Sequence, residues 1–221
     1  MSFSGTFTRD FTKPISFSQS LKEVYDILFI TWKMVKVNAD IPTGNLENDI
    51  TCIFYSKIRT KKAELTENGE RQYCFSFLLN SSEVNDNGKL IATTDIQVQF
   101  GNDERQRFTL EAKLLNKPKD NNIGAYVGYD GMGRFIRDGK YGIGVSAGGM
   151  IGYVLDGDAE KARNNVADSI MNKRKSLGMC STGILEESGL RESVYMTSHN
   201  RKQAPQQFTI YHVFLSVQNG N

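Results

Sequence analysis

Three ionisable residues in the middle of the chain, Asp95, Glu111 and Lys113, have the types and the spacing to do chemistry together. Glu111 and Lys113 stand two positions apart in the stretch RFTLEAKLL (107–115). Side chains alternate between the two faces of a strand, so both would point the same way. Such a pair is also an ordinary feature of a half-buried strand, and a Glu-x-Lys triplet arises by chance about once in a chain this rich in both residues. Whether the pair is functional therefore depends on the residues of the neighbouring strand.

A second carboxylate comes from the preceding strand. In LIATTDIQVQF (90–100), apolar residues alternate with polar ones that include Asp95. If the apolar faces of two neighbouring strands coincide, their polar faces coincide as well. We centre the hairpin tip on residues 103–104. Asp95 then lies opposite Glu111 or Lys113, at the short distance of cross-strand neighbours.

Two carboxylates and one ammonium in one patch leave an excess of negative charge. The carboxylates repel each other and would raise each other's pKa unless a cation lies between them, and Lys113 compensates only in part. Carboxylate oxygens suit Mg²⁺ or Mn²⁺, which keep coordination positions for water and for a phosphate oxygen. The sequence therefore predicts a Mg²⁺ or Mn²⁺ site at Asp95 and Glu111.

Asp95, the triplet Glu111-Ala112-Lys113 and the order of the predicted elements resemble the PD-(D/E)XK nucleases, a superfamily with the restriction-endonuclease-like fold. The resemblance covers roughly residues 45–155. It implies that Asp95, Glu111 and the backbone carbonyl of Ala112 hold the metal ion. It also implies that Lys113 positions or deprotonates the attacking water. Position 94 is Thr where the family name implies Pro.

A third acidic residue is expected from the helix before the sheet, because many members of this superfamily have one there. The chain offers Glu47 or Asp49. At about 100° per residue, Glu47 lies at the edge of the apolar arc of the helix, whereas Asp49 projects nearer the opposite side. We therefore choose Glu47 as a catalytic and metal-binding residue. An acid at this place more often marks only the end of the apolar stripe.

A looser resemblance concerns the residues after the triplet. Gly133-Arg134-Phe135 and GGMIGYV (148–154) look like segments that follow Glu-x-Lys in compact bacterial nucleases of restriction or phage defence. In such proteins the helix after the motif strand borders the substrate groove, which makes Arg134 and Arg137 candidate phosphate contacts. Lys117, in the same basic stretch, is a third candidate contact with nucleic acid. Solvation of a helix is the simpler account of each arginine.

The hydrophobic pattern predicts the elements that must position these residues. Short turns make the first three strands antiparallel neighbours, and the helix after them lets the next strand add in parallel. We therefore predict an α/β fold with a mixed central β-sheet flanked by helices and an αβββαβ restriction-endonuclease-like core. The expected helices are 20–37, 46–62, 123–140 and 158–177, and the expected strands are 72–80, 90–100, 107–115, 145–155 and 207–217.

One domain is expected for residues 1–221. In this interpretation the N-terminal helix 20–37 and the C-terminal helix and strand 158–217 are appended to a nuclease core at 45–155. The polar stretch 180–207 has no predicted structure and could dock a partner. His212 is expected to be a hydrogen-bonded structural residue, and His199 is expected in a solvated loop.

Composition excludes several classes of protein. The 221 residues are 39% hydrophobic and 24% charged, close to globular averages. A net charge of +2 is too small to indicate a nucleic-acid partner, and it excludes a strongly acidic surface. The 3 cysteines are widely spaced and form no C-x-x-C, so neither a disulfide framework nor a zinc site is indicated. We expect a cytoplasmic protein without membrane association, because no apolar run approaches the length of a span.

The function expected from the sequence is that of a Mg²⁺-dependent endonuclease that hydrolyses phosphodiester bonds of DNA in bacterial restriction or phage defence. The alternative is a catalytically inactive nucleic-acid-binding or regulatory subunit of a larger defence complex. DNA is the expected partner. A partner protein of a defence system and a second copy of the chain are further candidates. DNA or RNA as substrate, and one or two metal ions, are left open.

Overall fold

The computed structural model describes residues 16–35, 46–69, 73–84, 90–101, 106–116, 122–137, 141–142, 144–181 and 183–217. The helices are α1 (Phe17–Trp32), α2 (Leu46–Glu67), α3 (Ile123–Val127), α4 (Met132–Ile136) and α5 (Ala159–Asn172). The strands are β1 (Phe75–Leu79), β2 (Ser82–Val84), β3 (Leu90–Thr93), β4 (Ile96–Phe100), β5 (Arg107–Leu115), β6 (Ala147–Val154), β7 (Glu186–Glu187), β8 (Tyr195–Asn200) and β9 (Gln207–Ser216).

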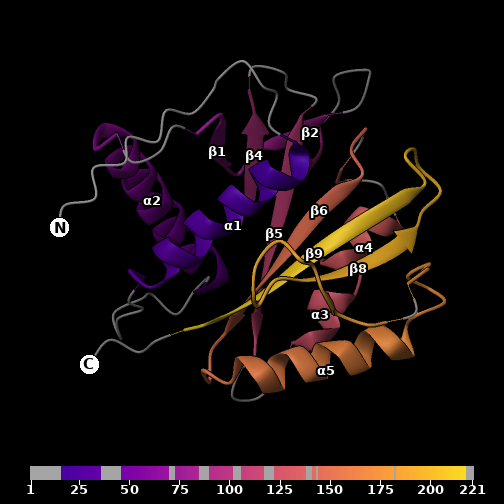
Figure 1. Ribbon diagram of the computed structural model, residues 1–221. Helices are drawn as coiled ribbons and strands as arrows, with labels where there is room; N and C mark the ends of the chain where they lie inside the picture. Colours follow the sequence, from indigo (N-terminus) through magenta and orange to yellow (C-terminus); the bar gives the residue numbers. More distant parts are fainter. Residues whose placement is uncertain are drawn as a thin grey trace.

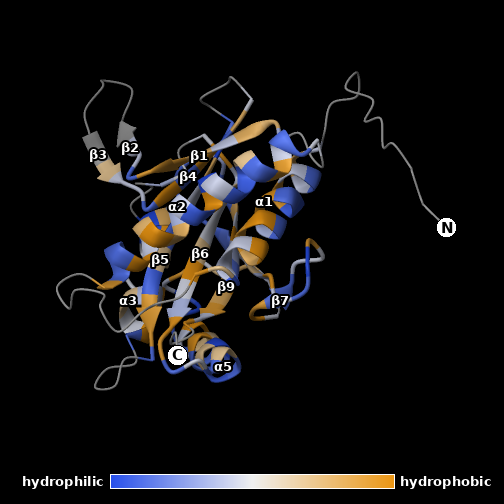
Figure 2. Cartoon of the chain, turned by 90° about the vertical axis from the view of Figure 1, so that its left-hand side faces the viewer, coloured by the Kyte–Doolittle hydropathy of each residue, from blue (hydrophilic) through white to orange (hydrophobic). Residues whose placement is uncertain are grey.

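A mixed seven-stranded sheet with helices on both faces organises the molecule, in the strand order β1-β4-β5-β6-β9-β8-β7 (Figure 1). One apolar cluster packs α1 and α2 on the first face, and a second packs α3, α4 and α5 on the other. Blue and orange alternate along α1 and α2 in Figure 2, as expected for helices with one buried side. The predicted α/β class is thereby confirmed. None of the helices in the described ranges is long and apolar enough to cross a membrane.

The register between β4 and β5 is one of the two that the hairpin prediction left open. The strands are antiparallel with Ile96 opposite Leu110, which centres the hairpin on position 103. β5 then pairs with β6 in parallel, Leu110 opposite Gly149, as the crossover after β5 requires. Both strand directions inferred from the connections are therefore confirmed.

The strand predicted over 90–100 is broken in two at residues 94–95. Thr94 donates its backbone N–H to Ser81 O at 2.9 Å, and Asn80 donates its N–H to Asp95 O at 3.1 Å. These bonds turn the chain, so that β3 pairs with β2 in a separate two-stranded sheet while β4 joins the main sheet. The break leaves Asp95 just before β4, with its side chain free to reach β5.

The single helix predicted over 123–140 is wrong, because α3 and α4 are separated at Gly128–Gly131. Gly131 has φ −124° and ψ −112°, outside the helical region. A Cβ added at Gly131 would lie 2.0 Å from the carbonyl oxygen of Tyr126, so only glycine fits there. The turn points α4 toward β5, and this brings Arg134 to the middle of the sheet.

α1 begins at Phe17, earlier than the predicted helix 20–37. Ser16 is the N-cap, since its side chain accepts the backbone N–H of Gln19 at 3.2 Å. Ser20, the first residue of the predicted helix, therefore lies inside α1. At the other end, Trp32 donates its indole N–H to Ser216 O at 2.8 Å, which ties α1 to the end of β9.

The segment 158–217 contributes strands to the same sheet as β5. β9 lies between β6 and β8, parallel to β6 and antiparallel to β8. The unassigned stretch 180–207 contains β7 and β8. β8 was not predicted from the sequence, because its buried residues Thr197 and His199 are polar. The strand therefore lacks the apolar alternation that marks a half-buried strand.

Candidate active site

The open edge of β5 is the feature around which the site is built. Pairing between β4 and β5 ends at Ile96 and Leu110, whereas β6 stays paired with β5 as far as Leu115. Within the described residues, positions 111–115 of β5 therefore have a strand on one side only; we call the other side the open edge. Backbone groups on such an edge need other partners.

Two carboxylates accept the amides of the open edge. Asp95 Oδ2 accepts the N–H of Ala112 at 2.7 Å. Glu47, in the first turn of α2, accepts the N–H of Leu114 through Oε2 at 3.0 Å. The acids thus stand where a neighbouring strand would place its carbonyl oxygens, at the point where β4 leaves β5.

The carbonyls of the open edge are also bound by side chains. Lys113 Nζ donates to Ala112 O at 2.7 Å, and Asn122 Nδ2 donates to Leu114 O at 3.0 Å. The Ala112 carbonyl therefore lies on the same side as Asp95. The family resemblance requires the Ala112 carbonyl on the side of Asp95, because both would bind the same metal ion.

Lys113 is held by three oxygen atoms. Besides Ala112 O, its Nζ lies 2.8 Å from Glu111 Oε1 and 3.0 Å from Glu47 Oε1. An ammonium has three N–H groups, so this arrangement uses all of them. Burial lowers the pKa of Lys113, but the charges of Glu111 and Glu47 outweigh that effect and raise the pKa above its ordinary value. The lysine is therefore held in its charged form.

Glu111 is the most deeply buried acid of the site, with 1% of its surface exposed. Its Oε1 faces Lys113 and lies 3.6 Å from Arg134 Nη1. Its Oε2 is buried without a hydrogen-bond partner, which is costly for a carboxylate oxygen. Burial, followed by the charge of Asp95, raises the pKa of Glu111 to about 7 against the opposing effects of Lys113 and Arg134. Asp95 and Glu111 thus lie on one side of the sheet, as predicted.

Asp95 itself is largely enclosed. Burial raises its pKa, while the hydrogen bond from Ala112 and the charge of Lys113 act in the opposite direction. Two carboxylates whose pKa values are both raised by burial form the kind of site that a cation stabilises.

Arg134 is fixed beside Glu111 by Tyr141, a residue that the sequence analysis missed. Arg134 donates to the hydroxyl of Tyr141 and lies over its ring, with 5.3 Å between the guanidinium carbon and the ring centroid. Tyr141 is fully buried, and its hydroxyl donates to Thr93 O at 2.5 Å. The side chain of Arg134 remains 28% exposed, so it can still meet a ligand.

Of the other predicted contacts with nucleic acid, Arg137 is not brought to this cluster. Arg137 is exposed and donates to Ser176 Oγ at 2.9 Å, beyond the end of α5. Lys117 lies outside the described residues. Glu47, chosen over Asp49, does reach the site through Lys113 and Leu114.

The residues present fit a Mg²⁺ or Mn²⁺ ion. Within the described ranges, no group of three or more His, Cys, Asp or Glu side chains forms a complete cage for a metal. Mg²⁺ does not require one, since it is commonly held by one or two carboxylates and completes its shell with water and substrate phosphate. The buried, unpartnered Oε2 of Glu111 next to Asp95 and the Ala112 carbonyl supplies such a donor set.

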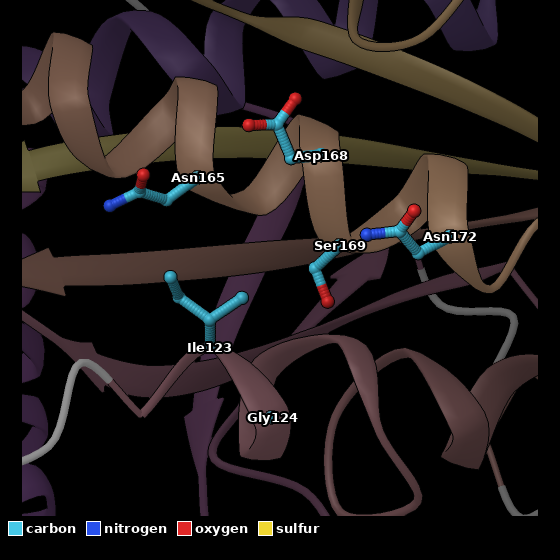
Figure 3. A pocket seen from close by; sticks show the side chains of 6 residues that line it. All are labelled: Ile123, Gly124, Asn165, Asp168, Ser169 and Asn172. Atoms are coloured by element: carbon cyan, nitrogen blue, oxygen red, sulfur yellow. The ribbon is translucent and has the colours of Figure 1, made fainter.

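A hollow between α3 and α5 is separate from this cluster. It has a volume of about 320 Å³, and amide and hydroxyl groups point into it (Figure 3). Asp168 is its one ionisable residue, so it lacks the paired groups that acid–base chemistry needs. Its lining is Ile123, Gly124, Asn165, Asp168, Ser169 and Asn172.

Two buried histidines form a hydrogen-bonded chain outside the site. Tyr126 Oη lies 3.1 Å from His212 Nδ1, His212 Nε2 lies 2.8 Å from Thr197 Oγ1, and Thr197 Oγ1 lies 2.7 Å from His199 Nε2. His199 Nδ1 lies 2.9 Å from Leu177 O, a carbonyl that can only accept, so His199 donates there. Each hydroxyl then donates to the next imidazole, and both rings are neutral. The structural role expected for His212 is confirmed; the solvated loop expected for His199 is wrong.

Comparison of the chain with models of protein families, with curated proteins and with solved structures finds no match, so its function has to be argued from the cluster of Asp95, Glu111, Lys113 and Arg134.

Proposed function

We propose that the protein is a Mg²⁺-dependent endonuclease that hydrolyses phosphodiester bonds of DNA. The observation that carries the proposal is the meeting of Asp95, Glu111 and the Ala112 carbonyl at the open edge of β5, with the ammonium of Lys113 among them. This set combines oxygen donors for a hard metal ion with a cation for the reacting phosphate. It also supports a restriction-endonuclease-like core built on β4, β5 and β6.

The metal ion would be held by Asp95, Glu111 and the carbonyl of Ala112. When bound, it neutralises charge that develops on the phosphate and lowers the pKa of a coordinated water. Mn²⁺ would serve as well as Mg²⁺, because both prefer oxygen ligands.

The cations of the site act on the phosphate and the water. Lys113 in its charged form donates hydrogen bonds, so it orients the attacking water or binds a nonbridging phosphate oxygen. Its raised pKa argues against a neutral lysine that abstracts a proton. Arg134 offers further N–H groups in a planar array suited to phosphate, and Tyr141 keeps that array next to Glu111.

The setting of this activity is proposed by extension of the family resemblance. DNA is the substrate, restriction or phage defence is the biological role, and the cytoplasm is the compartment. A partner protein or a second copy of the chain would align the site with the strand to be cut.

The experiment is a cleavage assay on supercoiled DNA, linear DNA and RNA with Mg²⁺, with Mn²⁺ and with chelator. Wild-type protein should cut DNA only with the metal. Glu111→Gln and Lys113→Met should lower the rate by more than about a hundredfold, since the first removes a ligand of the metal ion and the second a cation that acts on the water or the phosphate. Asp168→Asn removes an acid of the α5 hollow and is the matched control. Equal cutting by wild type and Glu111→Gln would overturn the proposal.

A second candidate is a nucleic-acid-binding or regulatory subunit without catalysis. The close pairing of Lys113 with both Glu111 and Glu47 favours it, because the ammonium already neutralises part of the acidic cluster. Such a protein would bind DNA with steep salt dependence and would show no Asp95-dependent binding of Mn²⁺.

A further inference from the structure

We infer that Glu47 positions Lys113 and is not a ligand of the metal ion. The inference rests on the proposed function and deepens it, because it gives one acid of the site, Glu47, a task different from that of the other two, Asp95 and Glu111. It also replaces the expectation from the sequence, in which Glu47 was a third carboxylate ligand.

Both carboxylate oxygens of Glu47 already have donors. Oε1 accepts from Lys113 Nζ at 3.0 Å, and Oε2 accepts the backbone N–H of Leu114 at 3.0 Å. Turning this carboxylate toward a metal ion would break one of these bonds and leave a backbone amide or an ammonium without its partner, which costs free energy. Glu111 differs, since its Oε2 is buried and has no partner to lose.

The main chain at Glu47 is fixed by contacts that lead back to the sheet. Thr51 Oγ1 donates to Glu47 O at 2.8 Å and lies 3.3 Å from the hydroxyl of Tyr153, a fully buried residue of β6. Ile50 and Phe54 bury the adjoining side of α2 in the core. These contacts keep the carboxylate of Glu47 beside Lys113 and Leu114 of β5.

The charges of the cluster support the same division. Glu47 balances Lys113, and Asp95 with Glu111 balances one divalent ion. Arg134, 28% exposed, is then the cation that remains for the phosphate. A third carboxylate on the ion would leave Lys113 without this counter-charge.

The first experiment separates metal binding from catalysis. Mn²⁺ titration by calorimetry should show one ion bound to the wild type, and affinity for Glu47→Gln within about tenfold of it, whereas Asp95→Asn and Glu111→Gln should lose more than about a hundredfold. Glutamine keeps a single acceptor oxygen, so one of the two bonds is lost. Glu47→Gln should therefore lower kcat by about tenfold or more with little change in KM. Asp168→Asn should match the wild type throughout.

A double variant tests whether Glu47 acts through Lys113. Glu47→Gln combined with Lys113→Met should cut no more slowly than Lys113→Met alone, because the residue to be positioned is gone. A further loss in the double variant would contradict the inference. A loss of Mn²⁺ affinity in Glu47→Gln equal to that in Glu111→Gln would overturn it.

Crystals of the wild type soaked with Mn²⁺ provide a test that does not depend on the folding of any variant. The anomalous peak should lie about 2.1 Å from oxygens of Asp95, Glu111 and Ala112, and well outside bonding distance of Glu47. A peak coordinated by Glu47 would overturn the inference and leave the proposed nuclease intact. Failure of the wild type to bind Mn²⁺ in solution and in the crystal would overturn the proposed function as well.

Discussion

The backbone N–H of Ala112 donates to the carboxylate of Asp95 at 2.7 Å, across the point where β4 leaves β5. Asp95 therefore has two tasks. It closes a hydrogen bond of the sheet, and it offers its charge to the proposed metal site. The two tasks can be separated by substitution, because only the second needs a negative charge.

Asp95→Asn should stay folded and lose metal binding. The side-chain oxygen of asparagine can still accept the N–H of Ala112, whereas Asp95→Ala leaves this amide unpaired and should lower the free energy of unfolding by about 1–3 kcal/mol. Urea unfolding measures the stability of each variant and Mn²⁺ titration measures the binding. Equal stability of Asp95→Ala and wild type would show that the amide does not depend on this carboxylate.

Tyr141→Phe should weaken the hold on Arg134. The variant keeps the ring beneath the guanidinium but removes the hydroxyl that accepts from Arg134 and donates to Thr93 O. We expect a rise in KM for DNA of about tenfold to a hundredfold, as for the loss of one hydrogen bond to a charged group. Tyr195→Phe is the matched control, because Tyr195 accepts from Arg163 at 3.0 Å outside the site. If both variants raise KM equally, Arg134 does not owe its place to Tyr141.

The buried histidines should make the fold sensitive to acid. Burial lowers the pKa of His199 to about 4 and that of His212 to about 3, below the ordinary value of 6.5. At pH values between about 4 and 6.5, both histidines bind a proton in the unfolded chain but stay neutral in the folded protein. This contribution to stability is complete above about pH 6.5 and is lost as the pH falls, by about 2 kcal/mol for each histidine between pH 7 and pH 5.

Two measurements check the histidine prediction. The NMR signals of both imidazole rings should stay at their neutral positions down to pH 5, and midpoints near 6.5 would contradict the burial argument. Urea unfolding should be followed in Glu111→Gln, because Glu111 gives the opposite pH dependence of stability in this window. Its pKa is raised to about 7, so as the pH falls Glu111 is protonated in the folded protein before it is protonated in the unfolded chain.

Arg201 should be essential for the stability of the segment that carries Tyr141. It is buried and donates to the carbonyls of Gly142, Val145 and Pro205 at 2.7–2.9 Å, while its guanidinium lies 4.2 Å from the ring centroid of Phe208. Lysine cannot reproduce this fork of donors.

Arg201→Lys should therefore lower the free energy of unfolding by about 2–4 kcal/mol. Arg174→Lys is the control, since Arg174 donates to a single carbonyl, that of Ser181, at 2.8 Å. Urea unfolding compares the two. A cost for Arg201→Lys no larger than that for Arg174→Lys would contradict the role of Arg201.

The sequence contained enough to predict the hairpin register and the meeting of Asp95 with Glu111, because strand alternation and turn length are local properties. The choice of Glu47 over Asp49 also followed from helix geometry. Local patterns do not contain the break at residues 94–95, which depends on hydrogen bonds to Asn80 and Ser81 in another segment.

Polar residues inside the fold were the main source of error. His199, expected in a solvated loop, and Arg201 are both buried, because hydrogen bonds to distant groups offset the cost of removing them from water. Tyr141 gave no signal either. Its importance lies in its contacts with Arg134 and Thr93, and long-range contacts of this kind leave no periodic trace in the sequence.

The position of β9 inside the sheet has a consequence for synthesis of the protein on the ribosome. Strand β6, which supports β5 beneath the acidic cluster, is flanked on its other side by β9, and β9 is complete only after residue 216 has been translated. The nascent chain therefore carries Asp95, Glu111 and Lys113 for a long interval without a finished sheet to hold them. The proposed nuclease would therefore complete its active site only after translation has passed β9.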